Sequence, residues 1–262
     1  MVGGCLASAG HHVTWISEGR SQATIMRAKR AGLSEHPSLL AGLSKADFIL
    51  SICPPDAAQN VAAEIASTGF KGVYIDANAV APATARQIEA TLSKAGATMV
   101  DGGIVGPPPT AAGRTRLFLS GASAMEAAVL FHGTALEAIP TGPDIGAASA
   151  LKMAYAAWTK GTSALFLAIR ALARAEGVEA PLIEEWRRSQ PTLAGPKAET
   201  ARHSIAKAWR FSGEMQEIAD CFAAQNLPAG FHLAAADIFE MLAEFKHTSD
   251  PDLDAAIDRL LR

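Results

Sequence analysis

The fold is decided by residues 46–83, which read ADFILSICPPDAAQNVAAEIASTGFKGVYIDANAVAPA. Two apolar runs in this stretch, residues 48–53 and 72–76, have the composition of buried strands. Residues 57–67 lie between them and have the composition of a helix. Apolar strands that alternate with helices predict a mostly parallel sheet covered on both faces, which is the doubly wound α/β arrangement.

The same alternation continues on both sides of this stretch. Strands are expected at residues 13–17, 98–105 and 117–119, and helices at residues 2–9, 22–31 and 83–94. A doubly wound domain opens with a strand and a glycine-rich turn, but here the first element is the helix at residues 2–9. Because that first strand is central in the usual strand order, we expect a gap in the sheet.

Beyond residue 142 the sequence predicts helices alone. Residues 147–178 contain no proline and are rich in Ala and Leu, which predicts one helix of about 30 residues and about 45 Å. Further helices are expected at residues 182–189, 198–221, 232–246 and 253–261. The predicted organisation is therefore an α/β domain over residues 1–142 and an all-helical domain over residues 143–262.

Composition excludes several classes of protein. Hydrophobic residues make up 49% of the chain and charged residues 19%, so there are enough apolar groups for a core and the chain is not expected to be disordered. The net charge of −3 indicates no basic surface for nucleic acid, and no uncharged apolar run is long enough to cross a membrane. The first residues lack the pattern of a signal peptide.

Cysteine and histidine usage agrees with this interpretation. Cys5, Cys53 and Cys221 lie far apart and form no C-x-x-C motif, which argues against a disulfide framework and against a zinc site. The seven histidines lack the spacing of metal ligands. We expect a cytoplasmic protein without a metal.

Seven segments, taken in order, resemble one superfamily. They are AGHHVTWISEGRS (9–21), ADFILSICPPDAA (46–58), GVYIDANAVAPATA (72–85), MVDGGIVGPPPTAAGRTRLFLSG (99–121), GAASALKMAYAAWTKG (146–161), RFSGEMQEIADCF (210–222) and LPAGFHLAAADIFEML (227–242). The set resembles the β-hydroxyacid dehydrogenase and 6-phosphogluconate dehydrogenase superfamily, in particular a branch with a distinctive helical C-terminal domain. The resemblance implies a Rossmann domain over residues 1–142, a nicotinamide cofactor, and a helical domain that forms a homodimer.

Members of this superfamily open with a strand and a G-x-G-x-x-G turn. Here both would lie upstream of Met1. A mis-assigned start or a truncated sequence is therefore favoured over genuine loss of the turn.

The adenosine ribose of a dinucleotide is recognised at the end of the second strand of such a domain. Ser17, Arg20 and Ser21 lie at that point. A guanidinium and a helix N-terminus suit a 2′-phosphate, which favours NADP over NAD. Glu18 argues the other way because it could accept a hydrogen bond from a 2′-hydroxyl, and the simpler interpretation is a turn with Ser21 as a helix N-cap.

Cys53, Pro54 and Asn78 follow two of the predicted parallel strands. Loops at the carboxyl edge of a parallel sheet line the ligand crevice, and the resemblance implies that these three residues contact the ribose and nicotinamide. No neighbour in the sequence would lower the pKa of Cys53, so we interpret it as a small packed residue and not as a nucleophile.

Residues 101–107 (DGGIVGP) resemble the substrate loop of the superfamily, in which a serine and two glycines hold the substrate carboxylate. The resemblance makes Val105 and Gly106 candidate substrate contacts. Val105 stands in place of the serine and Pro107 in place of a glycine, so a hydroxyl and an N–H donor are lost. This departure weakens the case for the usual hydroxy-acid substrate, and a rigid connection between strands is the alternative.

Lys152 is the candidate general acid and base. It lies near the start of the long predicted helix among apolar residues, where desolvation lowers the pKa of an ammonium group. The resemblance implies that Lys152 takes the hydroxyl proton of an alcohol as hydride leaves for the nicotinamide, or returns that proton in reverse. The alternative is a lysine that extends its charge from the helix into solvent.

Three further positions are candidates for the same site. Tyr155 and Ala156 stand where the superfamily has two asparagines, so Tyr155 is a candidate second catalytic group, with wall or core packing as the alternative. Thr159, one turn further along, and His232 are candidate substrate contacts, although packing is the simpler role for the histidine.

The sequence therefore predicts an NAD(P)-dependent oxidoreductase that transfers hydride between nicotinamide and a small hydroxy acid or related carbonyl compound. An imine reductase on the same scaffold is one alternative. A non-catalytic binding protein that retains the dinucleotide fold is the other. We expect the small-molecule site to lie between the domains.

Overall fold

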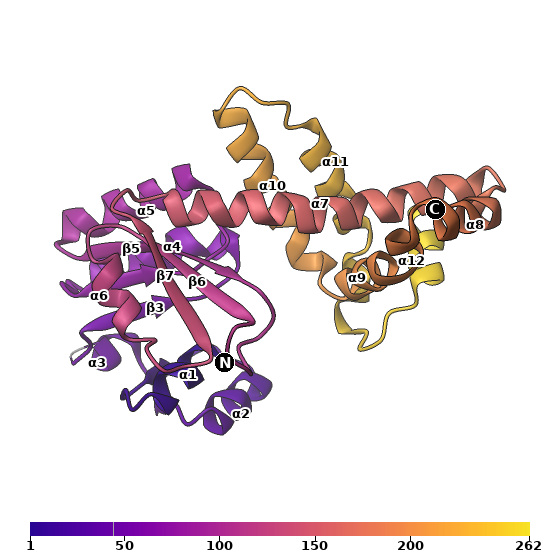
Figure 1. Cartoon of the computed structure of the whole chain (residues 1–262). Coiled ribbons are helices and arrows are strands. Elements are labelled where there is room, and N and C mark those ends of the chain that lie inside the picture. The colour runs from indigo at the N-terminus through magenta and orange to yellow at the C-terminus, as the bar shows by residue number, and fades with distance from the viewer. Residues whose placement is uncertain (44) are drawn as a thin grey trace. The chain divides into compact units, whose positions relative to one another are not determined.

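The computed structural model describes residues 1–43 and 45–262 (Figure 1). The chain folds as two compact units, residues 1–152 and 153–262, and the division falls inside the longest helix. The first unit is an α/β domain and the second consists of helices. Among the described helices, none is both long and apolar enough to cross a membrane.

The main sheet of the first unit has five strands in the order β3-β4-β5-β6-β7. They are β3 (Phe48–Ser51), β4 (Val73–Asp76), β5 (Thr98–Val105), β6 (Thr115–Ser120) and β7 (Leu136–Gly142). All neighbouring pairs are parallel except β5 and β6, which are antiparallel. The mostly parallel sheet predicted from the sequence is confirmed.

Helices cover both faces of this sheet, as the continuous apolar strands predicted. On one face, Tyr74 and Met99 pack with residues of α4 (Pro55–Ser67) and α5 (Pro82–Ala95). On the other face, Ile75, Val100 and Leu117 pack with residues of α1 (Val2–Ser8) and α6 (Ala124–Val129). The two faces therefore form two separate hydrophobic clusters.

Two further strands form a sheet of their own. β1 (Thr14–Ile16) pairs in parallel with β2 (Ser34–His36), and α2 (Gln22–Arg30) and α3 (Leu39–Leu43) accompany them. Across the described residues, no strand pairing joins β1 or β2 to β3. The gap expected from the sequence is present, and among the described strands β4 is the one that pairs with β3.

The second unit begins within α7 (Ala147–Ala175), the 29-residue helix that the sequence predicted as one element. The remaining elements are α8 (Glu179–Ser189), a π-helical turn (Leu193–Lys197), α9 (Ala198–Ile205), α10 (Ala208–Ala224), α11 (Gly230–Met241), a 3-10 turn (Ala243–His247) and α12 (Leu253–Leu260).

Two helices predicted from the sequence are divided in the structure, and the one expected over residues 232–246 ends at Met241 and is followed by a 3-10 turn. Residues 198–221 were expected to form a single helix, but the structure divides them between α9 and α10. At the break, the N–H of Lys207 donates to the carbonyl of Ser204, three residues back. The Ser204 hydroxyl also donates to the backbone, at the carbonyl of Ala201. Such local bonds compete with the regular helical ladder, and a composition of good helix formers does not reveal them.

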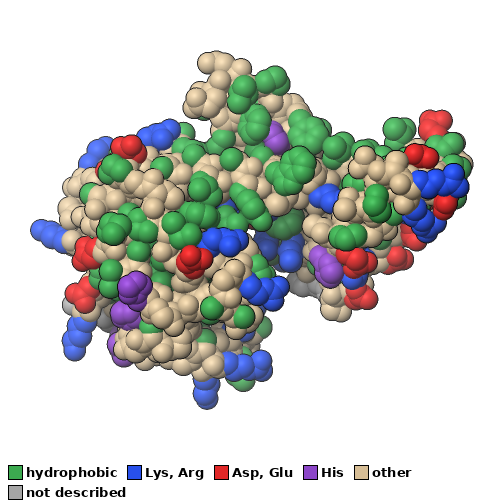
Figure 2. All heavy atoms as spheres, viewed as in Figure 1, with side chains coloured by type: hydrophobic (Ala, Val, Ile, Leu, Met, Phe, Trp, Pro, Cys, Tyr) green, Lys and Arg blue, Asp and Glu red, His purple; other side chains and the backbone are tan. Residues whose placement is uncertain are grey.

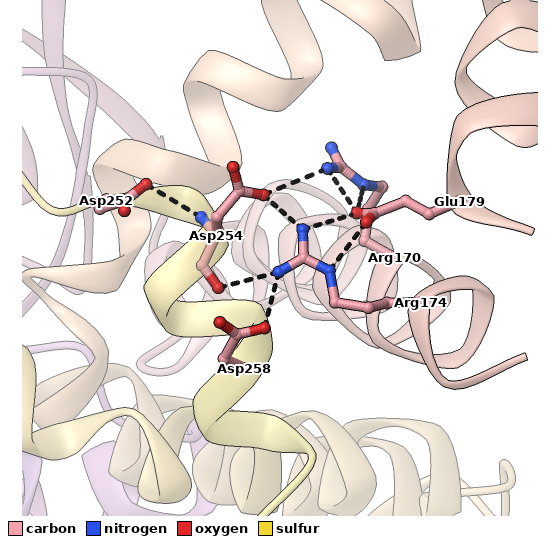
Figure 3. A network of polar contacts seen from close by, with 6 residues as sticks. All are labelled: Arg170, Arg174, Glu179, Asp252, Asp254 and Asp258. Carbon is pink, nitrogen blue, oxygen red and sulfur yellow. Dashed lines mark hydrogen bonds and ion pairs between the residues drawn. The ribbon is translucent and has the colours of Figure 1, made fainter. Parts of the chain in front are cut away.

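A network of charged side chains joins three helices of the second unit (Figure 3). Arg174 of α7 donates to both carboxylate oxygens of Glu179 in α8, at 2.7 and 3.1 Å, and to Asp254 and Asp258 of α12, at 2.5 and 2.7 Å. Arg170 also donates to Glu179, at 2.7 Å. Partial burial alone would raise the pKa of Glu179, but hydrogen bonds from the two arginines hold it below its usual value. The network attaches the C-terminal helix to α7.

Candidate active site

Asn78 joins the carboxyl ends of β3 and β4. The N–H of Cys53 donates to Asn78 Oδ1 at 2.6 Å, and Asn78 Nδ2 donates to the Ser51 hydroxyl at 3.1 Å. The backbone N–H of Asn78 donates to Asp76 Oδ1 at 3.0 Å. The structure therefore brings together two residues singled out from the sequence, Cys53 and Asn78, at the sheet edge where ligands of such folds bind. Pro54 follows directly and is the N-cap residue of α4.

Buried polar atoms lie beneath this edge. The Tyr74 hydroxyl and Asp76 Oδ2 are buried, and neither has a hydrogen-bond partner among the described residues. Burial raises the pKa of Asp76 to about 6. The hydrogen bonds from Asn78 act to lower this pKa, and the neighbouring charge of Asp101 adds to the rise. Burial also raises the pKa of Tyr74. The edge therefore contains a carboxyl group that titrates close to neutrality.

Cys53 has the properties of a packed residue and not those of a nucleophile. Burial raises the pKa of its thiol, the Ser51 contact opposes the rise, and the charges of Asp76 and Asp56 add to it. The thiol is therefore protonated at neutral pH, which agrees with the interpretation from the sequence. The positive charge of Arg20 lies near enough to favour the thiolate slightly, which places the loop after β1 in the neighbourhood of the end of β3.

The loop after β1 contains the three residues proposed to recognise the adenosine end. The Ser17 hydroxyl donates to the carbonyl of His36 in β2, at 3.4 Å. Ser21 is the N-cap of α2, and its hydroxyl accepts from the N–H of Thr24, also at 3.4 Å. Arg20 is exposed, and the first turn of α2 contains no acidic residue. The arrangement thus combines an exposed guanidinium with the positive end of a helix.

Asp101 is a residue whose role the sequence analysis missed. It is 1% exposed and ties the start of α7 to β5 and β6. Its Oδ2 accepts from the N–H groups of Gly146 and Ser149 and from the Ser120 hydroxyl, all at 3.0 Å. Its Oδ1 accepts from the Ser149 hydroxyl at 2.5 Å, and Ser120 in turn accepts from the N–H of Ala148 at 3.1 Å. The sequence did contain a signal for this role. The long helix starts at Gly-Ala-Ala, which has no side chain that could cap it, so the acceptor for its first N–H groups must come from another part of the chain.

Lys152 lies directly against β5. Gly103 packs so close to α7 that a Cβ at this position would stand 2.8 Å from both Lys152 Cβ and the Ala148 carbonyl oxygen. The lysine is half-buried and belongs to the first unit. Asp101 and Gly103 therefore fix both the start of α7 and the position of Lys152 on the sheet.

The segment at residues 101–107 is mostly strand and not loop. β5 continues to Val105, which is 2% exposed, and the chain turns at Gly106. Gly106 has φ of 118°, and a Cβ there would meet the Arg114 carbonyl oxygen at 2.4 Å, so only glycine fits. The carbonyl of Pro107 accepts from the Thr115 hydroxyl at 2.6 Å. The alternative of a rigid connection between strands describes this geometry well.

The remaining candidates lie in the second unit. Tyr155 is 48% exposed on α7, and the Thr159 hydroxyl donates to its backbone carbonyl at 3.2 Å. His232 is 5% exposed, and its ring packs against that of Phe222 in a tilted arrangement, with 4.2 Å between the ring centroids. Its Nδ1 has no hydrogen-bond partner in the described part of the chain, and burial lowers its pKa. The histidine is therefore neutral at pH 7, as a packed residue would be. Within the described residues, no group of His, Cys, Asp and Glu could hold a metal ion.

Comparison with known proteins identifies both units. Residues 1–137 match the family described as the NAD-binding domain of 6-phosphogluconate dehydrogenase, and residues 173–242 match a domain family of unknown function, DUF1932. An uncharacterized 28.5 kDa protein of Methanothermus fervidus is 29% identical over 168 residues. The match covers 64% of each chain, so this chain spans less than two thirds of that relative's length.

Solved structures share the fold over almost the whole chain. The conserved protein MTH1747, described as structurally similar to 3-hydroxyacid dehydrogenases, is 27% identical, with a TM-score of 0.66 and 93% of each chain covered. The Mycobacterium tuberculosis 3-hydroxyisobutyrate dehydrogenase with L-serine is 18% identical, with a TM-score of 0.73, 99% of this chain and 94% of that chain covered. A Streptomyces aurantiacus imine reductase is 19% identical, with a TM-score of 0.53 and the same coverage. From the match to more than half of its residues, the chain belongs to the family of the NAD-binding domain of 6-phosphogluconate dehydrogenase.

Proposed function

We propose that the protein is an NADP-dependent oxidoreductase that transfers hydride between nicotinamide and a small hydroxy acid or related carbonyl compound. The observation that carries the proposal is the placement of Lys152 against β5 at Gly103, within the unit that matches the NAD-binding family. Structural relatives whose names describe 3-hydroxyisobutyrate dehydrogenases support this reaction class.

The residues of the first unit fit a nicotinamide dinucleotide at two places. The loop after β1 has an exposed Arg20 beside the N-terminus of α2, and no carboxylate occupies the first turn of that helix. A 2′-phosphate finds two favourable partners there, which is why we propose NADP in preference to NAD. The ends of β3 and β4, joined by Asn78, would hold the nicotinamide side.

In this mechanism Lys152 moves the proton and the sheet edge orients the reactants. A nicotinamide, when bound, supplies the acceptor or donor of hydride. During oxidation, Lys152 Nζ takes the hydroxyl proton while the C–H bond of the same carbon breaks with its electron pair. During reduction, Nζ returns the proton to the carbonyl oxygen. Asp101 and Gly103 would hold the helix that presents this amine. Tyr155, one turn along α7, is the proposed second group.

Lys152→Ala tests the proposal. NADPH and then NADH are titrated by calorimetry into the wild type, and turnover is followed at the absorbance of NADPH with 3-hydroxyisobutyrate, 3-hydroxypropionate and L-serine. We expect the variant to bind NADPH as the wild type does and to lose turnover. Lys94→Ala, which removes an exposed lysine at the end of α5, is the matched control and should keep turnover. Retained turnover in Lys152→Ala would exclude the assigned role.

Imine reduction is the second candidate, because imine reductases and a reductive aminase share the fold. A lysine suits transfer of the proton of an alcohol, which favours the first candidate. Turnover of a cyclic imine such as 2-methyl-1-pyrroline, without turnover of any hydroxy acid, would favour the second. Absence of binding of either cofactor would instead favour a non-catalytic binding protein.

We also propose a homodimer formed through the helical unit. α7 exposes apolar side chains at heptad spacing, with Trp158 74%, Leu165 42% and Leu172 63% exposed. Figure 2 shows hydrophobic side chains gathered along this part of α7 and over α10 and α11. A regular uncharged stripe of this kind is self-complementary, so a second copy of the chain can pack against it.

A further inference from the structure

Arg116 is a half-buried cation whose guanidinium makes no hydrogen bond to an acid among the described residues. It lies in β6, is half-buried, and forms no ion pair or side-chain hydrogen bond with any residue that the structure describes. Arginine side chains that lose part of their hydration are normally paired with an acid. Glu137 of β7 lies beside Arg116 in the parallel register of β6 and β7, but it is exposed and forms no ion pair with Arg116 among the described residues, so the donors of the guanidinium remain available to a small anion.

Strand register places Arg116 on the sheet face that α7 covers. In the antiparallel pair of β5 and β6, Ser120 lies opposite Asp101, and Arg116 lies opposite Val105. Ser120 bonds to the first turn of α7, so this set of alternating side chains points toward that helix. Leu117 and Leu119, between them, point into the opposite core. Arg116 therefore lies on the same face of the sheet as Gly103, against which Lys152 of α7 packs.

The spacing brings the two cations within reach of one small molecule. Lys152 lies over Gly103, and Val105 is two residues further along the same strand, a step of about 6.8 Å. Arg116 lies across from Val105, at about 5 Å between Cβ atoms. Both side chains are long and flexible. The ammonium of Lys152 can therefore reach the hydroxyl of a small molecule while the guanidinium of Arg116 reaches a group one or two carbons away on the same molecule.

The turn after β5 offers an anion little else to bind. Residues 107–109 are three consecutive prolines, which have no N–H donors. Val105, opposite Arg116, has no polar side-chain atom. The guanidinium of Arg116 is a stronger donor than Val105 or the three prolines can offer, and its planar fork matches a carboxylate.

We propose that Arg116 binds the carboxylate of the substrate and so makes the enzyme select small hydroxy acids over neutral alcohols. The inference rests on the proposed function, since it assumes that the reacting hydroxyl lies at Lys152. Specificity for an acid would then come from a side chain of β6 and not from residues 101–107, the segment that resembles the substrate loop of the superfamily.

The test compares Arg116→Gln with Arg114→Gln, which removes the same charge from an exposed position two residues earlier. Binding of 3-hydroxypropionate and of neutral 1,3-propanediol is measured by saturation-transfer NMR with NADP⁺ present, and inorganic phosphate serves as a competitor. For Arg116→Gln we expect a Kd for 3-hydroxypropionate about 10- to 100-fold higher, because a charge-assisted bidentate contact is lost. Binding of 1,3-propanediol should not change, Arg116→Lys should recover part of the affinity, and Arg114→Gln should match the wild type.

Two results would overturn the inference: carboxylate binding within twofold of the wild type in Arg116→Gln, or equal loss of the acid and the diol. Displacement of 3-hydroxypropionate by millimolar phosphate would overturn the choice of a carboxylate. The proposed function fails separately. If the wild type binds no dinucleotide and turns nothing over, but binds 3-hydroxypropionate through Arg116 without cofactor, the anion site stands and the oxidoreductase does not.

Discussion

Replacing Asp101 by Asn removes one negative charge from the start of α7 and keeps the shape of the side chain. Three hydrogen bonds converge on Asp101 Oδ2, from Gly146, Ser149 and Ser120, each at 3.0 Å. A hydrogen bond to a charged acceptor contributes about 1.5–3 kcal/mol and a neutral one about 0.5–1.5 kcal/mol, so neutralisation costs about 1 kcal/mol per bond. The helix N-terminus also loses a favourable charge. We therefore expect the free energy of unfolding to fall by about 3 kcal/mol.

Urea unfolding followed by circular dichroism measures this loss. For a slope of about 3 kcal/mol/M, the midpoint should shift by about 1 M. Asp144→Asn is the matched control, because it makes the same chemical change at an exposed position three residues before the helix; it should stay within about 0.5 kcal/mol of the wild type. A loss below 0.5 kcal/mol in Asp101→Asn, or an equal loss in Asp144→Asn, would refute the reasoning.

Three further predictions follow from other parts of the molecule. Burial raises the pKa of Asp76 to about 6, so the stabilising contribution of its protonated form is complete below about pH 4 and is lost as pH rises through 6. In urea unfolding, Asp76→Asn should therefore exceed the wild type in stability by about 2–3 kcal/mol at pH 8 and by little at pH 4. An equal gain at both pH values would contradict this prediction. Arg174→Met removes the contacts to α8 and α12 and should cost about 1–2 kcal/mol, with faster amide exchange in α12; unchanged exchange there would rule the network out as its attachment. Trp158→Glu places a charge in the exposed stripe of α7 and should halve the mass measured by light scattering, whereas a mass equal to that of the wild type would argue against this interface.

Strong periodic segments of the fold were predictable from the sequence. β5 has the predicted bounds of residues 98–105, and α7 ends three residues before its predicted end. The failures have local causes. β2 is a three-residue polar strand, Ser34–His36, with no apolar pattern to detect. β7 is the edge strand beside β6 and contains Pro140, a residue that argues against a strand when it is met in a sequence.

The candidate site was predictable only in part. Strand ends followed by Cys53 and Asn78 were enough to place both at one sheet edge. Their partners Ser51 and Asp76 are ordinary strand residues in the sequence. The contact of Asn78 with Ser51 depends on the pairing of β3 with β4, and its contact with Asp76 depends on the turn directly after β4. Arg116 illustrates the same limit, because only the antiparallel register sets it opposite Val105.

The separation of β1 and β2 from the main sheet has a consequence for local opening. A two-stranded sheet is marginally stable alone, and its backbone amides exchange with solvent through small, frequent fluctuations. The loop that contains Arg20 and Ser21 follows β1, so a dinucleotide whose adenosine end binds there would contact a segment that no strand pairing ties to the main sheet among the described residues. Part of the binding free energy then goes into closing that segment, and saturating NADPH should slow amide exchange in β1 and β2 far more than in β4 and β5.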